Sequence, residues 1–286
     1  MGLPKMTGTL TRWKTAVAVL GCAIVLAACG EPELTEAERL ENTPPQVIFE
    51  EAEADLASRN TNRAAQLFGE VERLYPYSEW AKRALIMQAY SFHRAQNYEA
   101  SRSTAQRFID FFPADPEAAY AQYLLALSYY DQIDDVGRDQ GLTFQALQSL
   151  RTVIEVYPES EYATSALLKF DLAFDHLAGK EMEVGRFYLR GGHYLAAANR
   201  FRVVVEDFQT TSHTPEALHR LVEVYLSLGL DAEAQAAGAI LGYNFQSTQW
   251  YQDSYNLLTG QGLQPGAVGD NWLSQAYRQM IKGEWL

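Results

Sequence analysis

The stretch RLYPYSEWAKRA, from Arg73 to Ala84, places an aromatic residue and a proline between two segments with helical apolar spacing. Proline suits a point where one helix has ended and the next has not begun. Three further stretches share the layout, the last with glutamine for proline: DFFPADPEAAYA from Asp110, EVYPESEYATSA from Glu155 and EDFQTTSHTPEAL from Glu206. Their aromatic residues, Tyr75, Phe112, Tyr157 and Phe208, are spaced by 37, 45 and 51 residues. Self-similarity near this period predicts a helical solenoid.

The segments before these aromatic residues carry a small, a large and an apolar residue at offsets of four and three, which form one helix face. The aligned residues are Ala64, Phe68 and Val71, then Ala146, Leu150 and Val153, then Ala197, Phe201 and Val204. This pattern resembles the tetratricopeptide repeat, a pair of antiparallel helices. We expect an all-α, elongated solenoid of about five such pairs, near residues 45–76, 77–113, 114–158, 159–209 and 214–243. An ordinary helical bundle is the alternative, but it does not explain the recurring aromatic residue and proline.

Two of the repeats are longer than the pattern requires. The third contains DQIDDVGRDQG, from Asp131 to Gly141, whose acidic spacing fits no calcium-binding EF-hand. The fourth has an unbroken helical pattern from about Glu161 to Arg190. A helix of that length extends beyond its own repeat and offers a face to another molecule.

The amino-terminal segment reads as a secretory signal. Lys5, Arg12 and Lys14 precede an apolar run that ends in LAAC at Cys29. These four residues resemble the lipobox of bacterial lipoproteins, which implies cleavage between Ala28 and Cys29 and acylation of Cys29. An ordinary signal peptide is the alternative. Glycine rather than aspartate follows the cysteine, which favours the outer membrane.

These features divide the chain into four parts. Residues 1–28 are expected to be the lipoprotein signal peptide, and residues 29–44, acidic and containing proline, a flexible leash. The repeat array is expected over 45–243. A carboxy-terminal tail over 244–286 is expected to contain one short amphipathic helix, with Trp272, Tyr277, Ile281 and Trp285 on its apolar face.

Charge and motif content exclude several classes of function. Removal of residues 1–28 takes away three positive charges and leaves 20 Lys and Arg against 36 Asp and Glu, a net charge of −16. Such a surface repels nucleic acid, so we expect no nucleic-acid partner. The five histidines show no metal-ligand spacing, and there is no G-x-S-x-G motif or phosphate-binding glycine loop. We therefore expect no enzyme activity, no metal and no cofactor.

A repeat solenoid binds partners on the concave surface built from its first helices. In the tetratricopeptide layout, the positions that line this surface are occupied here by Arg83, Tyr90, His93, Tyr120, Tyr123 and Tyr130. Tyrosine offers apolar area with a polar tip, which suits a site for extended peptides. These residues are therefore the candidate groove. The alternative is that some of the tyrosines pack between helices.

The combination of a lipobox, an acidic leash and five repeats resembles the BamD family of β-barrel assembly lipoproteins. The matching segments include YPYSEWAKRA, GRDQG, YPESEYATSALLKF and EVGRFYLRGGHYLAAANRFRVVVEDF. The resemblance implies a rod anchored by lipid to the outer membrane and facing the periplasm. It implies as partners the BamA-type barrel subunit, other assembly lipoproteins and unfolded outer-membrane proteins. It also implies a subunit contact through the fourth repeat, at Asn199, Arg200 and Arg186. The competing interpretation is a periplasmic scaffold for cell-wall or division enzymes.

Overall fold

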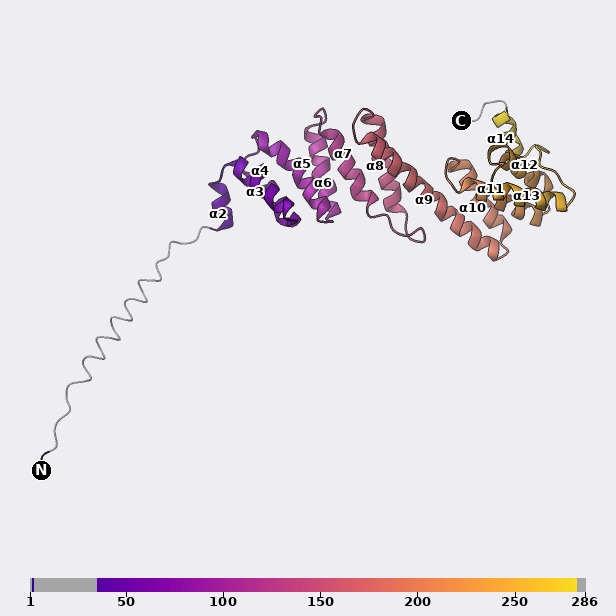
Figure 1. Cartoon of the computed structure of the whole chain (residues 1–286), viewed down its shortest axis with the longest axis horizontal. Coiled ribbons are helices and arrows are strands. Elements are labelled where there is room, and N and C mark those ends of the chain that lie inside the picture. The colour runs from indigo at the N-terminus through magenta and orange to yellow at the C-terminus, as the bar shows by residue number, and fades with distance from the viewer. Residues whose placement is uncertain (1, 3–34, 282–286) are drawn as a thin grey trace.

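A computed structural model describes residue 2 and residues 35–281 of the chain. Within that part the chain forms α-helices and no strand, and the helices stack into a long rod (Figure 1). The helices are α2 (Glu36–Glu41), α3 (Pro45–Ala57), α4 (Thr61–Leu74), α5 (Glu79–Arg94), α6 (Tyr98–Phe111), α7 (Ala118–Tyr130), α8 (Gly141–Val156), α9 (Ala163–Arg190), α10 (Tyr194–Asp207), α11 (Thr214–Ser227), α12 (Asp231–Asn244), α13 (Gln249–Gly260) and α14 (Trp272–Ile281). The prediction of an all-α solenoid is confirmed.

Helices α3 to α12 form five consecutive pairs, each packed chiefly against its neighbours in the sequence. The small, large and apolar residues that aligned in the sequence are all fully buried between the two helices of a pair: Ala64, Phe68 and Val71, Ala146, Leu150 and Val153, and Ala197, Phe201 and Val204. The core is therefore a row of adjoining clusters rather than one centre. Such nearest-neighbour packing is typical of repeat proteins.

The recurring aromatic residue is the cap that ends the second helix of each pair. The carbonyl of Tyr75 accepts hydrogen bonds from the backbone N–H of Ser78, at 3.0 Å, and from its hydroxyl, at 2.8 Å. The backbone bond recurs from Asp115 to Phe112, and both bonds recur at Tyr157 with Ser160 and at Phe208 with Thr211. The polar residue three positions after the aromatic residue thus closes a tight turn and directs the chain into the next helix.

The same turn occurs a fifth time, at Phe245, where sequence analysis did not place one. Thr248 donates to the Phe245 carbonyl from its N–H, at 3.0 Å, and from its hydroxyl, at 2.7 Å. Helix α13 follows and packs against α11 and α12, with Leu258 fully buried. The expectation of one short helix in the tail therefore missed α13. The signal was present, since FQSTQW from Phe245 has the aromatic spacing of YPYSEW from Tyr75 without its proline.

The last helix, α14, lies where the amphipathic helix was expected, with Leu273 fully buried against α12. Trp285, the last residue of the expected apolar face, lies outside the described residues.

Part of the expected leash is also helical. Thr35 caps α2 through a reciprocal pair of hydrogen bonds with Glu38, and Leu40 is buried against the first repeat. Arg39 forms two hydrogen bonds with Glu51 of α3, at 2.9 and 3.1 Å. The acidic composition suggested a flexible segment, but one apolar residue and a capping pair hold residues 36–41 on the end of the solenoid. The expectation of a flexible leash is wrong for these residues.

The two helices of a pair are joined by a turn that contains one residue with positive φ. The positions are Arg59, Gln96, Gly192 and Gly229, and Gly262 follows α13 in the same way. In each case the next residue donates its N–H to the carbonyl five residues before it, at 2.8 to 2.9 Å. The third repeat departs from this, because residues 131–140 form its longer connection.

Substitution of Gly229 by alanine is expected to lower the free energy of unfolding by about 1 kcal/mol, because a side chain disfavours its φ of 71°. There is open space around the position, so the effect isolates backbone strain. Chemical denaturation would measure it. Gly260→Ala, at the end of α13, also has open space but no positive φ and is the control. Equal effects of the two substitutions would contradict the account of the turn.

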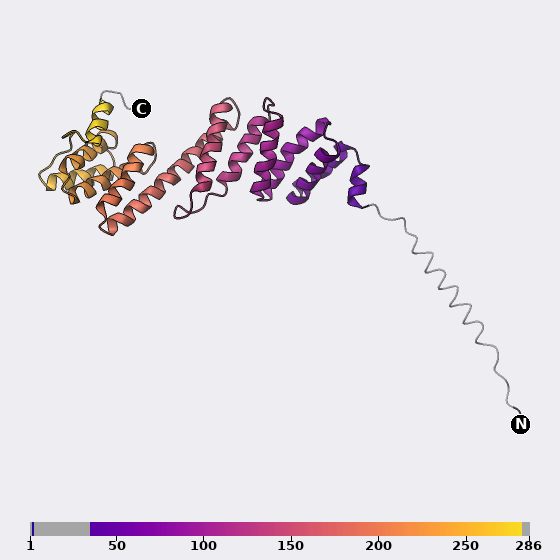
Figure 2. The same cartoon turned by 180° about the vertical axis from the view of Figure 1, so that it is seen from behind.

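Helix α9, with 28 residues, joins the two halves of the rod. It packs against α8 over its first half and against α10 over its second, and views from both sides show it between two lobes (Figures 1 and 2). Gly185 lets α10 approach closely, since a Cβ there would lie 2.4 Å from the buried ring of Phe201. In the described part of the chain, every extensive helix–helix contact between the halves involves α9.

Candidate partner-binding surfaces

The central tyrosine of the expected groove is part of the core. Tyr123 is 9% exposed, and its hydroxyl lies 2.6 Å from the Ser165 hydroxyl. Its ring stacks on Tyr162 with centroids 5.4 Å apart, and Tyr120 packs on the same ring at 5.1 Å. The start of α9 therefore covers this part of α7. The prediction that Tyr123 lines an open surface is wrong, and the alternative of packing between helices holds for it.

Burial also changes the acidity of two of these tyrosines. Desolvation, followed by nearby tyrosine and glutamate side chains, raises the pKa of Tyr120 well above its usual value. Desolvation, followed by a hydrogen bond and the charge of Glu161, raises the pKa of Tyr162 to about 12. Both phenols are protonated at neutral pH, as an unshifted tyrosine also is, and the raised pKa extends this state to more alkaline pH.

The other expected groove residues are at least partly accessible, and most have a partner within the chain. Arg83 is exposed and lies over the rings of Phe49, at 5.1 Å, and Trp80, at 4.9 Å. Tyr90 is half-buried against the core of α5 to α7. Arginine stacked on two aromatic rings keeps its charged edge free while its face is covered. Phe49 and Trp80 were not among the expected site residues.

His93 and Tyr130 lie at the far end of the same helices. The Nε2 atom of His93 is 3.0 Å from Asp131, and its ring meets Tyr98 edge to face. The ring of Tyr130 lies 5.3 Å from the ammonium group of Lys169. The surface of repeats two and three is thus a mixed aromatic and charged one. Such a lining suits an extended peptide better than a small molecule.

The second expected surface lies on the fourth repeat, around Arg200. Asn199 and Arg200 are exposed in the middle of α10. The Arg200 side chain is 44% exposed, and its Nη1 lies 3.0 Å from a carboxylate oxygen of Glu181 in α9. Glu206, further along α10, pairs with Arg202 instead. Arg200 therefore points away from the core and has an internal partner in Glu181.

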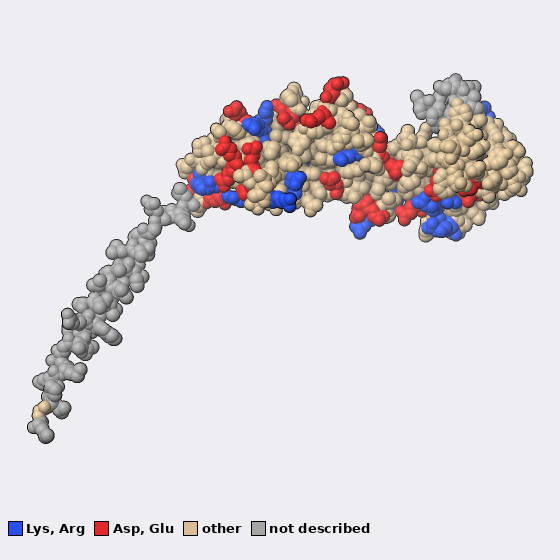
Figure 3. Space-filling model, in the orientation of Figure 1, with Lys and Arg blue, Asp and Glu red and all other residues tan. Residues whose placement is uncertain are grey.

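Arg186 has a different role in the structure. Its guanidinium lies 3.0 Å from Glu216 of α11, which is largely buried and also contacts Arg220. This ion pair ties the long helix to the fifth repeat. Basic side chains gather over the end of α9 and the start of α10, where Figure 3 shows a blue patch on an otherwise mostly uncharged lobe. Arg186 thus has a structural role through its ion pair with Glu216.

A protein-family model named YfiO, described as an outer membrane lipoprotein, matches residues 41–240. The match spans more than two thirds of the chain and contains both candidate surfaces. This chain belongs to the YfiO family. The YfiO match ends within α12, so α13 and α14 lie beyond the part that defines the family. The resemblance stated from the sequence is confirmed.

Several curated relatives of this YfiO chain are named outer membrane protein assembly factor BamD. The protein from Caulobacter vibrioides is 47% identical over 257 residues, which cover 90% of this chain and 82% of the relative. That from Rickettsia prowazekii is 40% identical over 87% of this chain and 97% of the relative. The protein from Neisseria meningitidis serogroup A is 27% identical over 81% of this chain and 91% of the relative.

Among the helices that the structure describes over residues 35–281, none is long and apolar enough to cross a bilayer. Ala28 and Cys29, the expected cleavage and acylation sites, lie outside the described residues. The expected lipid anchor therefore remains a prediction from the sequence.

Proposed function

We propose that this chain is a lipid-anchored, non-enzymatic component of the outer-membrane β-barrel assembly complex. The observation that carries the proposal is the 47% identity over 90% of the chain to an assembly factor BamD. The helical rod supports it, because it presents two separate surfaces for partners along its length. These relatives favour assembly over the competing interpretation, a scaffold for cell-wall or division enzymes.

In this proposal the two surfaces have different partners. Unfolded outer-membrane proteins bind across repeats two and three, where Arg83, Tyr90, Tyr120 and their neighbours offer aromatic faces and hydrogen-bond donors. The BamA-type barrel subunit binds at the fourth repeat, through Asn199 and Arg200. Other assembly lipoproteins complete the complex. The rod faces the periplasm from its anchor in the outer membrane.

The subunit contact is tested by charge reversal. Arg200→Glu is expected to weaken association with the barrel subunit by about 1–2 kcal/mol, because Arg200 is half exposed and already shares its charge with Glu181. Titration of the purified chain with the subunit's periplasmic domains would measure the loss. An affinity equal to that of the unmodified chain, at ordinary ionic strength, would remove Arg200 from the interface.

Two variants separate the contact from the internal ion pair. Glu181→Arg combined with Arg200→Glu restores an ion pair between α9 and α10, so the fold is repaired while the partner still meets the wrong charge. Arg202→Glu reverses the charge of a neighbouring arginine that pairs with Glu206, and it is the control for a charge reversal near Arg200. We expect the double variant to bind as poorly as Arg200→Glu. Recovery of binding by the double variant would show that the internal pair alone was responsible.

The anchor is tested at Cys29. Since the only other cysteine, Cys22, precedes the expected cleavage site, Cys29→Ser is expected to abolish acylation and release the chain from the outer membrane. Membrane fractionation and mass spectrometry of the amino-terminal peptide would check this. Cys22→Ser is the matched control and should change neither result. Retention of the Cys29→Ser chain with an unmodified amino terminus would contradict the lipoprotein assignment.

A further inference from the structure

The first half of α9 exposes apolar side chains that none of the surfaces above uses. Leu168 and Leu172 lie one turn apart and are each 62% exposed. Leu172 borders two hollows, one of about 610 Å³ and one of about 510 Å³. Both hollows are also lined by Asp175, so they lie next to each other along one flank of the helix. We call this surface the α9 groove.

The walls of the α9 groove come from two loops. One is the third-repeat insertion, which contributes Asp135 and Val136, and the other is the loop after α10, which contributes residues 210–213. The insertion is fixed to α9 by a hydrogen bond of 2.9 Å from Lys180 to the Gly137 carbonyl. The second loop is fixed by Ser212, whose N–H and hydroxyl both donate to Asp175, at 3.0 and 2.8 Å. The groove is therefore preformed.

The floor of the groove is a single face of α9. Leu168, Leu172, Asp175, Gly179 and Glu183 recur every three or four residues and so share that face. Gly179 has no side chain to fill the groove, and His213 packs so closely on it that a Cβ there would lie 3.2 Å from the imidazole. Glu181, the partner of Arg200, lies nine residues after Leu172, which places it on the opposite side of the helix. The α9 groove is thus separate from the Arg200 surface.

The charge of the groove is predominantly negative. Its lining includes the carboxylates of Asp135, Asp171, Asp175 and Glu183. The one arginine that lines it, Arg186, is held by Glu216. Within residues 35–281, Asp171 and Glu183 take part in no ion pair. The α9 groove thus has apolar side chains at one end and unpaired carboxylates along its flank. A complementary partner is apolar where it meets the leucines and basic where it meets the carboxylates.

We propose that the α9 groove binds an amphipathic helix of another protein, with leucine-like residues that cover Leu168 and Leu172 and lysines or arginines that meet the carboxylates. The leucines contribute apolar area that is removed from water on binding. Because Glu183 lies about 16 Å along the helix from Leu172, the partner carries its basic residues over the next two to three turns. Nucleic acid and anionic lipid are excluded as occupants, since the carboxylates repel them.

The experiment uses a synthetic helical peptide of about 16 residues, with leucines one turn apart and lysines on the following turns. A matched peptide has glutamate in place of each lysine. Fluorescence anisotropy with the whole folded chain would measure both affinities. We expect the lysine peptide to bind and the glutamate peptide to bind at least about tenfold more weakly, because like charges oppose each other.

Variants of the chain locate the site. Leu172→Glu and Glu183→Lys are each expected to weaken the lysine peptide about tenfold, and both positions are exposed, so the fold should persist. Leu195→Glu, at an exposed leucine of α10, is the matched control and should leave binding unchanged. Arg200→Glu should also leave it unchanged. Equal binding of the two peptides, binding of neither, or equal binding to Leu172→Glu and the unmodified chain would overturn the proposal.

Discussion

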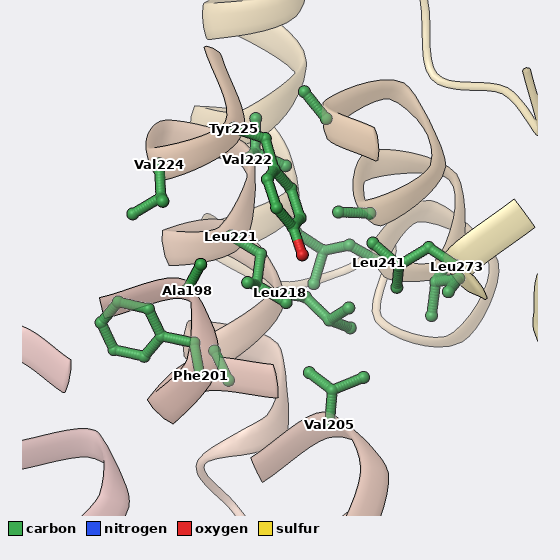
Figure 4. Close-up of a cluster of buried hydrophobic side chains, with 14 of the residues drawn as sticks. Ala198, Phe201, Val205, Leu218, Leu221, Val222, Val224, Tyr225, Leu241 and Leu273 are labelled. Atoms are coloured by element: carbon green, nitrogen blue, oxygen red, sulfur yellow. The ribbon is translucent and has the colours of Figure 1, made fainter. Parts of the chain in front are cut away.

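Replacement of Phe201 by alanine is expected to lower the free energy of unfolding by about 3–5 kcal/mol, the usual cost of truncating a fully buried phenylalanine. Phe201 is 0% exposed and lies in the cluster shown in Figure 4, together with Ala198, Leu218 and Leu221. Its ring also fills the space that Gly185 leaves on α9. Alanine at this position leaves a cavity between α9 and α10 that rigid neighbouring helices cannot close.

Chemical denaturation followed by circular dichroism would measure the loss. Phe187→Ala is the matched control, because Phe187 belongs to α9 and is 64% exposed. We expect its effect to stay within about 0.5 kcal/mol, as for most surface substitutions. A similar loss from the two substitutions would mean that the packing of α10 on α9 does not depend on the Phe201 ring.

Tyr123→Ala is expected to cost about 3 kcal/mol of unfolding free energy, because it removes a buried ring that packs on Tyr162 and leaves the Ser165 hydroxyl without its partner. Tyr123→Phe keeps the ring and removes only the hydroxyl, so its cost should be about 1 kcal/mol. The difference between the two measures the packing of the ring. The same denaturation experiment serves for both.

Tyr77, which is fully exposed in the turn before α5, provides the comparison. Its replacement by alanine should leave the unfolding free energy nearly unchanged. If Tyr123→Ala behaved like Tyr77→Ala, Tyr123 would line an open surface, as the sequence pattern suggested. The stability measurement therefore decides between a groove residue and a core residue without knowledge of the partner.

The repeat architecture was predictable because its signal is local. The cap at Tyr75 depends on Ser78, three residues later, and the buried face depends on residues three and four apart. Interactions over such short distances leave a pattern in the sequence itself. The turn at Phe245 was missed although glutamine follows it just as glutamine follows Phe208, and although the same aromatic residue and hydroxyl residue make its hydrogen bonds.

The accessibility of the site residues was less predictable, since it depends on residues distant in sequence. Tyr123 occupies a position that faces a groove in the tetratricopeptide layout, but Tyr162 and Ser165 at the start of α9 cover it. Arg200 was correctly expected at the surface, yet its partner Glu181 lies 19 residues earlier on another helix. Helical periodicity gives the direction of a side chain relative to its own axis. It does not give the position of the neighbouring helix.

The long helix α9 connects the two halves of the rod, so its stiffness governs the angle between them. At 1.5 Å per residue its 28 residues extend for about 42 Å. A helix bends gradually and resists stretching, so a load on either half changes the angle between the halves more than the length of the rod. A small bend in the middle of α9 produces a larger displacement at the two ends of the rod. Stiffness in this one element therefore sets how accurately a molecule held on one half is presented to a molecule held on the other.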